Sequence, residues 1–206
     1  GIGIELNGDL VATGVDASGT INAGRGTLSI TGSGDLHIGA DTTVRGGNAV
    51  AAEITGDSAV LGQLASDGDL SLRTANLTLG NGAVVGAGMD GTGLLAGNAA
   101  LDIGTDRIDA TGAQLLSSGE IRIASAGDLA LVGGELRAGG EVTVLGIGAF
   151  SNFMRMQAAG GLSLSGLSVA NYADLVAAED LALVATAGVA SNTAKLETGQ
   201  SLELAG

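Results

Sequence analysis

The sequence predicts an all-β chain folded as a single-stranded parallel β-helix, and three observations predict it. One phrase recurs about every 20 residues, the spacing of stacked-repeat architectures. Each copy of the phrase contains two apolar residues that flank a polar or small one. The 206 residues include 38 glycines and no proline, and only 1% are aromatic although 45% are apolar. An interior filled by Leu, Val, Ile and Ala without aromatic rings is narrow everywhere.

The repeated phrase has a first and a second apolar position, which are Leu136 and Val142 in "GGELRAGGEVTV". Its copies place these two positions at Ile4/Leu10, Ile21/Leu28, Val44/Val50, Leu64/Leu70, Leu95/Leu101, Leu115/Ile121, Leu136/Val142, Met156/Leu162, Leu175/Leu181 and Leu196/Leu202. The frame therefore covers residues 1–206 as one repeat domain of about ten coils.

A strand is predicted from the second apolar position of each copy. In Leu70–Ser71–Leu72, alternation at period two puts both leucines on one face and the serine toward water. A unit of about 20 residues with two or three such strands cannot bury its apolar face alone. Stacked units can, because each strand pairs with the equivalent strands above and below. About ten coils that each rise about 4.8 Å give a rod roughly 45 Å long.

Glycine and asparagine are expected at the corners between strands. Glycine supplies positive φ angles without a steric clash, and the absence of proline leaves every strand N–H free to pair. Asn152, Asn171 and Asn192 each precede the first apolar position of their copy by the same interval. We expect these three residues to stack in successive coils as a hydrogen-bonded ladder, at corners with the left-handed conformation that Asn tolerates.

Two stretches depart from the repeat. The step from Leu70 to Leu101 is longer than the others, so residues 73–93 are expected to leave the rod as a loop or short hairpin. Loops on rigid scaffolds often carry function, although a neutral excursion is the favoured interpretation. The second stretch is "AFSNFMRMQ", with Phe150 and Phe153, and Tyr172 follows one coil later. These aromatic residues mark either a wider part of the core, which we favour, or an exposed contact patch.

Charge and composition exclude several classes of function. The formal net charge is −14, which disfavours nucleic acid and anionic membrane surfaces as partners. No apolar run is long enough to span a bilayer, so membrane insertion is not expected. The chain has no cysteine, and it therefore has neither disulfides nor thiol chemistry.

The sequence assigns no catalytic, cofactor-binding or metal-binding residue, and an enzyme is not predicted. The one histidine, His37, alternates with apolar neighbours toward solvent, and Ser33 and Asp35 lie too near it along the strand to form a triad. A composition of one histidine and no cysteine disfavours a zinc site. "GAGMDG" (residues 86–91) matches a dinucleotide-binding pattern only by letter, because no helix is predicted after it. Lys195 lies in no phosphate-loop motif.

Carboxylates recur at one kind of position, immediately before a strand. Asp9, Asp69, Glu120, Glu141 and Asp180 precede the second apolar position, and Asp35 and Asp128 precede secondary apolar pairs. This repetition favours a structural role that keeps the strand ends solvated. Glu120 and Glu141 would repel each other in successive coils, and Arg122 and Arg137 are expected to relieve that repulsion. The alternative is a carbohydrate-acting β-helix, because such enzymes use carboxylates.

The phrase x-L-x-A-G-G-x-L-x-L, in copies rich in Gly, Ala, Ser, Thr and Asn, resembles the haemagglutinin repeats of filamentous haemagglutinin-type exoproteins. The resemblance extends from Ile4 to Leu204. It implies a right-handed β-helical shaft, exported through an outer-membrane two-partner secretion transporter and displayed at the cell surface. The Asn-Pro-Asn motifs of the family's secretion domain are absent, and neither end offers a polar cap. We therefore expect an internal segment of a longer chain.

These expectations combine into one predicted function. The chain would be a structural shaft of a secreted, surface-displayed bacterial adhesin or contact-dependent toxin, holding a binding or toxic module away from the cell. Two alternatives stay open. One is a polysaccharide lyase or depolymerase segment, and the other is direct recognition of a host receptor or glycan through residues 73–93.

Overall fold

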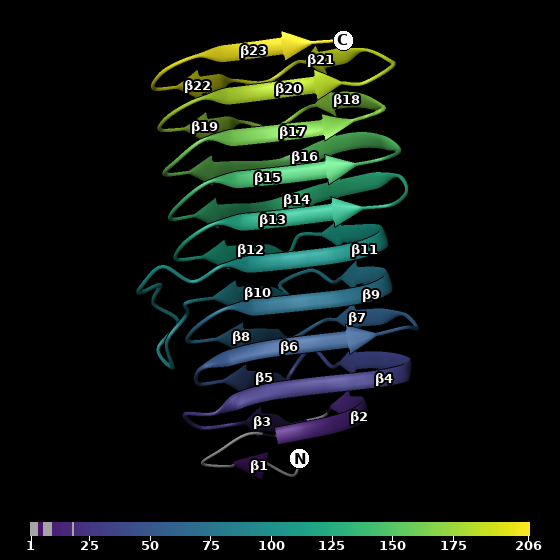
Figure 1. Ribbon diagram of the computed structural model, residues 1–206, viewed down its shortest axis with the longest axis vertical. Coiled ribbons are helices and arrows are strands. Elements are labelled where there is room, and N and C mark those ends of the chain that lie inside the picture. The colour runs from purple at the N-terminus through teal and green to yellow at the C-terminus, as the bar shows by residue number, and fades with distance from the viewer. Residues whose placement is uncertain (1–3, 6–9, 18) are drawn as a thin grey trace.

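The predicted architecture is confirmed. A computed structural model describes residues 4–5, 10–17 and 19–206, with side chains from Gly19 onward. Within that range the chain forms 23 strands and no helix, and the named strands pair only in parallel. In Figure 1 the strands nearest the viewer run from left to right and the chain climbs as it returns behind them, so the coil is right-handed.

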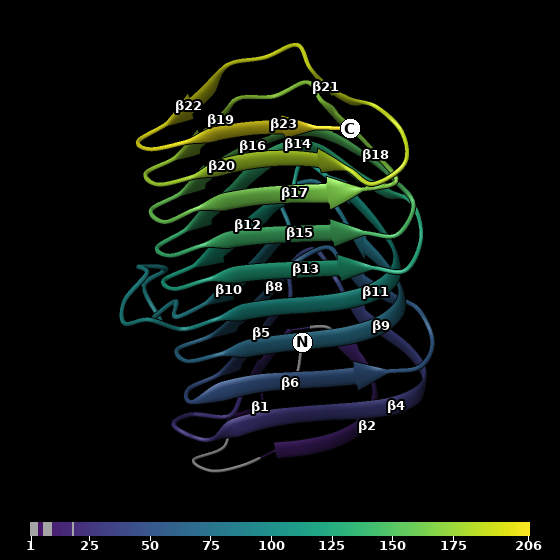
Figure 2. The same ribbon diagram turned by 45° about the horizontal axis from the view of Figure 1, so that its top comes forward.

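The strands lie on three faces that enclose the interior (Figure 2). Face 1 consists of β2 (Leu10–Ala17), β4 (Thr27–Ile38), β6 (Ala49–Ile54), β9 (Leu70–Leu79), β11 (Leu101–Thr111), β13 (Ile121–Ser125), β15 (Val142–Gly146), β17 (Leu162–Gly166), β20 (Leu181–Ala185) and β23 (Leu202–Ala205). Face 2 consists of the distal ends of β2, β4, β9 and β11, with β7 (Ser58–Val60), β14 (Leu129–Ala138), β16 (Ala149–Ala158), β18 (Ser168–Asn171) and β21 (Ala190–Asn192).

Face 3 completes the coil and leads back to face 1. It consists of β1 (Ile4–Glu5), β3 (Thr20–Asn22), β5 (Thr43–Gly46), β8 (Gln63–Ser66), β10 (Val84–Ala87), β12 (Gln114–Ser117), β19 (Leu175–Ala177) and β22 (Leu196–Thr198), with the distal ends of β14 and β16. β14 and β16 therefore run unbroken from face 2 into face 3.

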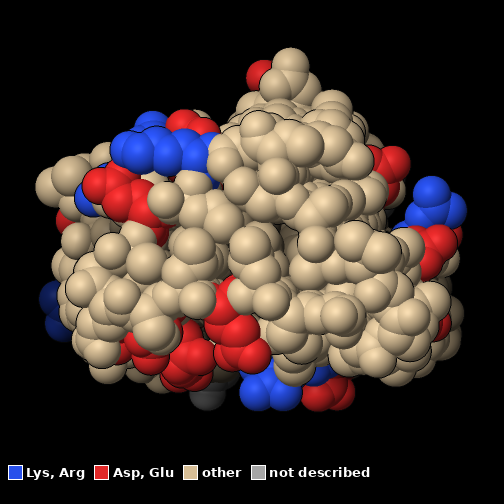
Figure 3. Space-filling view, turned by 90° about the horizontal axis from the view of Figure 1, so that it is seen from above, with Lys and Arg blue, Asp and Glu red and all other residues tan. Residues whose placement is uncertain are grey.

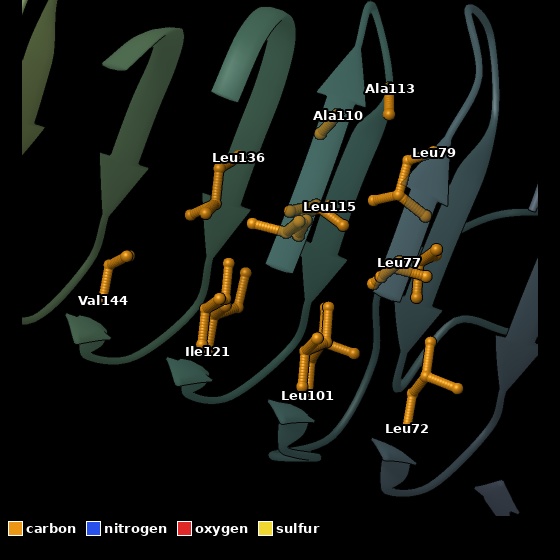
Figure 4. Close-up of a cluster of buried hydrophobic side chains, with 14 of the residues drawn as sticks. Leu72, Leu77, Leu79, Leu101, Ala110, Ala113, Leu115, Ile121, Leu136 and Val144 are labelled. Atoms are coloured by element: carbon orange, nitrogen blue, oxygen red, sulfur yellow. The ribbon is translucent and has the colours of Figure 1, made fainter. Parts of the chain in front are cut away.

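Equivalent residues of successive coils lie directly over one another. On face 1, Leu101 pairs with Ile121, Ile121 with Val142, and Val142 with Leu162, and all four are buried. The same register joins the face 1 strands from β2 to β23, so about nine turns separate the two ends of the column. Figure 4 shows how Leu101 and Ile121 from face 1 meet Leu115 and Leu136 from face 3. The thin aliphatic interior that the composition predicted is present.

The extra residues lie later in the chain than predicted. Residues 73–93 were expected to leave the rod, but β9 and β10 continue in register within this range, and Val85 pairs with both Leu64 and Leu115. Val85, not Leu95, therefore holds the first apolar position of this coil. The excursion comprises residues 88–100, between β10 and β11, because the corner from face 3 to face 1 admits added residues without breaking the strand pairing.

The asparagine ladder is confirmed. The Nδ2 atom of Asn152 donates to Oδ1 of Asn171 at 2.7 Å, and Asn171 donates in the same way to Asn192 at 2.6 Å. Each Nδ2 also donates to the backbone carbonyl two residues later in its own coil. The expected left-handed conformation is wrong, since positive φ angles among the described residues occur only at glycine. The three asparagines end or continue strands, and their amides point inward.

Glycine fills the corners for two separate reasons. In "GGELRAGGEVTV", Gly133 and Gly134 have φ angles of 67° and 83° at the bend from face 2 to face 3. Gly139 has no positive φ, but a Cβ added there would lie 2.1 Å from the carbonyl oxygen of Ser118 in the coil below. The first pair of glycines therefore turns the chain, and Gly139 allows adjacent coils to approach each other.

Candidate functional surfaces

The corner loop (residues 88–100) is the largest departure from the repeat, and it projects at the left of the rod in Figure 1. Oδ1 of Asp90 accepts hydrogen bonds from the backbone N–H and the hydroxyl of Thr92 and from the N–H of Leu94, at 2.7–3.0 Å. These bonds lower the pKa of the Asp90 carboxyl. Met89 is buried, whereas the Leu94 side chain is 67% exposed. The loop is thus ordered by its own bonds and presents one apolar residue.

A shallow recess of about 280 Å³ lies beside the corner loop. Leu95, Ala96 and Gly97 border it on the loop side, and Arg137 and Gln157 border it on the side of face 3. Arg137 makes no ion pair within the described residues. The recess therefore offers one guanidinium and one amide to a ligand, together with mostly small residues.

The carboxylates that precede strands bind backbone N–H groups of the next coil. Asp35 accepts from the N–H of Asp57, Asp69 from Ala100, Asp128 from Ala149, Asp174 from Lys195 and Asp180 from Ser201, at 2.8–3.2 Å. In every case the donor occupies the equivalent position one coil later. These aspartates therefore have a structural role other than the predicted solvation of strand ends, because each joins two coils where strand pairing begins. Asp174 was not among the carboxylates that the sequence singled out. Asp9 lies outside the described residues.

The glutamates of this set behave differently. Glu120 and Glu141 are exposed, and Glu141 accepts a hydrogen bond from the Thr143 hydroxyl at 3.1 Å. The expected relief by Arg122 and Arg137 is not present as an ion pair: the ion pairs among described residues are Arg45–Asp67, Arg73–Asp102 and Lys195–Glu197. A glutamate is one methylene longer than an aspartate, so its carboxylate extends into solvent beyond the backbone of the next coil.

The described residues contain no group of three or more His, Asp or Glu side chains placed to hold a metal ion. His37 is exposed, as predicted, and Asp35 accepts a hydrogen bond from the backbone N–H of Asp57. Gly86 and Ala87 of "GAGMDG" belong to β10, and the rest of that stretch opens the corner loop, with no helix after it. Figure 3, a view onto the C-terminal end, shows Asp and Glu mostly around the rim.

The aromatic residues divide between core and surface. Phe150 is buried in the face 2 column between Leu129 and Val169, as the core interpretation predicted. Phe153 and Tyr172 are 46% and 47% exposed, and their rings stack with centroids 4.4 Å apart and an interplanar angle of 10°. Both predicted alternatives are therefore present within one stretch of the chain.

The stacked rings belong to a longer exposed column at the bend from face 2 to face 3. Val132 pairs with Phe153, and Tyr172 and Thr193 occupy the equivalent positions of the two following coils. We call Val132, Phe153, Tyr172 and Thr193 the aromatic column. At the other edge of face 2, where the chain bends from face 1, three successive coils each carry one more exposed apolar residue. They are Ile147, Leu167 and Val189.

A second column runs beside the aromatic column, on face 3. Glu135 pairs with Arg155, and Asp174 and Lys195 precede Leu175 and Leu196, the next residues of the same register. We call Glu135, Arg155, Asp174 and Lys195 the charge column, because its sign alternates from coil to coil. Lys195 also pairs with Glu197 of its own coil at 2.6 Å, and this contact raises the pKa of Lys195.

No family model matches the chain, and neither a curated protein nor a solved structure matches it. Among the described residues, no helix has the length and apolarity needed to cross a membrane.

Sequence reasoning did not identify the charge column, the Asp174 contact or the apolar row of Ile147, Leu167 and Val189. Only the aromatic residues of this region were singled out. The signal was present, since all these residues recur at the spacing of the coil. It was missed because the alignment followed the apolar positions inside the rod and ignored those outside.

Proposed function

We propose that the chain is a rigid shaft segment of a secreted, surface-displayed bacterial adhesin or contact-dependent toxin. The observation that carries the proposal is the continuous register of the face 1 residues from β2 to β23. Each coil contacts its neighbours through strand pairing on three faces, and the aspartates add a bond between coils at the corners. Such a solenoid resists bending and sets a distance, which is the property that a spacer requires.

Two further features support this function. The buried side-chain N and O atoms of the described residues all have hydrogen-bond partners, so the interior offers no unsatisfied group for a ligand. The absence of cysteine suits a chain that passes unfolded through an outer-membrane two-partner secretion transporter, because no disulfide can form before export. The proposed partner during export is that transporter, and the proposed location is the cell surface.

Shortening the rod by whole coils tests the proposal. Deleting residues 142–161 joins Glu141 to Leu162, which occupies the register position of Val142. The chain would be displayed between an outer-membrane anchor and a binding module of known target. We expect capture of target on a facing surface to fall with each coil removed, while the unfolding transition remains cooperative. Capture that is independent of length would contradict the shaft function.

Recognition of a host receptor or glycan through the corner loop is a second candidate function. The exposed Leu94 and the recess that contains Arg137 and Gln157 favour it. Deleting the whole predicted segment, residues 73–93, would remove part of the rod. In the test, residues 90–97 are therefore replaced by a short Gly-Ser linker, which leaves the buried Met89 in place. Loss of binding to target cells with unchanged unfolding would support recognition by the loop. Unchanged binding would contradict this candidate function.

A carbohydrate-acting enzyme has less support. Asp35, Asp69, Asp128 and Asp180 are engaged by backbone N–H groups at the corners, spread along the rod. Glycosidic chemistry uses a pair of carboxylates held on the two sides of one bond. Incubation of the chain with acidic and neutral bacterial polysaccharides, followed by reducing-end assay, would test this alternative. Release of reducing ends, lost in a carboxylate variant, would favour it over the shaft.

A further inference from the structure

The aromatic and charge columns together form an exposed surface that strand pairing alone does not require. Val132, Phe153 and Tyr172 are each more than 40% exposed, although the chain places most of its large apolar residues inside. Exposed apolar groups that adjoin one another across several coils are typical of an interaction site. The charge column borders them on one side, and small residues of face 2, Ser151 and Ala170, border them on the other.

The ring geometry argues against a glycan as the occupant. Sugars stack on the flat face of an aromatic ring, where the π electrons are accessible. Here the faces of Phe153 and Tyr172 are turned toward each other, because the rings are nearly parallel at 4.4 Å. The remaining faces are directed along the column toward its other members. Ring edges and aliphatic carbon atoms are what the column presents to a partner.

The order of charges identifies a better occupant. From the lower to the upper coil the charge column carries Glu135, Arg155, Asp174 and Lys195, so its signs are negative, positive, negative and positive. A two-fold axis perpendicular to the rod reverses this order in the second copy. Glu135 then faces the partner's Lys195, and Arg155 faces the partner's Asp174. All four positions meet the opposite sign.

A parallel arrangement of two copies does not pair these charges. With the two-fold axis along the rod, the two columns exchange sides, so the charge column of each copy faces the aromatic column of the other. No charged position then meets the opposite sign, so charge pairing favours the antiparallel orientation. The perpendicular two-fold axis also places Phe153 against the partner's Tyr172 and Val132 against the partner's Thr193, so the apolar residues coincide as well.

We propose that the aromatic and charge columns form a self-complementary surface through which two copies of this chain associate side by side and antiparallel. The surface covers four coils, roughly 15 Å along the rod, so the contact belongs to the small class of interfaces that bury less than about 1,200 Å². The association is therefore weak and concentration dependent. It does not depend on the chain being part of an adhesin or toxin.

A charge-swap series tests the proposal by sedimentation equilibrium, from about 10 μM to about 1 mM chain. Lys195→Glu and Glu135→Lys each create like-charge contacts across the two-fold axis, and each should weaken dimerisation by about tenfold or more. Combining them restores opposite signs at every position, so the double variant should dimerise within about threefold of the original chain.

The double variant separates association from a role inside one chain. In a single copy it places a new lysine beside Arg155 and a new glutamate beside Asp174. A purely intramolecular charge column therefore predicts that the double variant is the least stable of the set and never recovers dimerisation. Thermal unfolding of each variant shows whether it is folded. A monomeric original chain at all concentrations, or a double variant as monomeric as the singles, would overturn the proposal.

Orientation is tested with engineered cysteines, since the chain has none of its own. An equimolar mixture of Val132→Cys and Thr193→Cys chains should form the mixed disulfide, because these positions face each other only in the antiparallel dimer. Same-position disulfides would need Cα atoms to close a gap of roughly 14 Å, beyond the reach of the bond. Predominant same-position products would overturn the antiparallel arrangement.

A matched pair of apolar variants completes the design. Phe153→Ser should weaken dimerisation by about tenfold, since it removes a ring from the centre of the contact. Leu94→Ser changes an exposed apolar residue in the corner loop, outside both columns, and should leave dimerisation unchanged. Equal effects of both variants would indicate nonspecific hydrophobic association and would contradict the proposal.

Discussion

The lower and upper coils of face 2 distribute polar and apolar side chains in opposite ways. In the lower coils the inward column at the bend to face 3 is apolar, with Ile38, Val60 and Leu79. In the upper coils the same column holds Asn152, Asn171 and Asn192, and the neighbouring outward column holds Phe153 and Tyr172. The inward residues nevertheless pair as one continuous column from Ile38 to Asn192.

Stacking of like on like, rather than apolarity at each position, therefore holds this bend together. An amide among leucines would lose its hydrogen bonds to water, which costs free energy. An amide above another amide donates to its neighbour and to its own backbone, so nothing is left unsatisfied. The polar column is therefore stable as a set, and each of its members depends on the next.

The largest effect is expected where a charge breaks the ladder. Asn171→Asp replaces a donor by an anion that faces Oδ1 of Asn192 and the carbonyl of Ala173. We expect the free energy of unfolding to fall by about 3–5 kcal/mol at pH 7, measured by guanidinium unfolding. Ala170→Asp, whose side chain points outward from the adjacent position, is the control and should cost far less. If both variants lost the same free energy of unfolding, the ladder would be no more sensitive to a charge than the outer surface.

A single buried amide should cost less where it can join the ladder than where it cannot. Leu79→Asn buries an amide between Val60 and Ala110 and should cost about 3 kcal/mol. Leu131→Asn lies directly below Asn152 and would extend the ladder by one member, so its cost should be about 1 kcal/mol. Denaturant unfolding of the two variants measures the difference. If both cost the same, a neighbouring amide gives no compensation.

The stacked rings should contribute less than the ladder. A double-mutant cycle of Phe153→Ala and Tyr172→Ala should give a coupling free energy of about 0.5–1.5 kcal/mol, because the rings contact each other although both are half exposed. The cycle is measured on dilute chain, so that self-association does not contribute. A control cycle of Phe153→Ala with Leu94→Ala, whose side chain lies in the corner loop, should give no coupling.

The smallest effect concerns the acid dependence of the corner contacts. Hydrogen bonds from the hydroxyl and N–H of Ser201 lower the pKa of Asp180 in the folded chain. A lowered folded pKa gives stability that is present above the unfolded value of about 3.9 and is lost as pH falls through the folded pKa. Asp180→Asn should therefore flatten part of the decline in melting temperature below about pH 4. Glu203→Gln, an exposed acid of the next coil, should not.

The sequence predicted the interior well because the interior repeats. Every coil must present an apolar residue to the coil above and the coil below, so the spacing of Ile121, Val142 and Leu162 was sufficient to place them in one column. The asparagine ladder was predictable for the same reason. Its backbone conformation was not, since Asn can occupy either a corner or a strand end, and only the inward amide distinguishes them.

The corner loop and the outer columns could not be placed in the same way. Leu95 and Leu101 reproduce the spacing of the repeated phrase, so the alignment preferred Leu95 to Val85, although Val85 continues the column from Leu64. Local spacing cannot tell which of two matching residues is covered by the coil below. The outward residues follow no burial constraint, and their role depends on which neighbours they meet in space.

The corner loop also indicates how such a rod can be modified. It adds residues 88–100 at one bend while the strands on both sides stay paired in register. Closing a flexible segment becomes costlier only slowly with length, by about 0.6 kcal/mol for each doubling. A foreign peptide grafted at this bend would therefore be carried at a fixed height on an otherwise unaltered scaffold, as an antigen carrier or a ruler for measuring distances between cells would require.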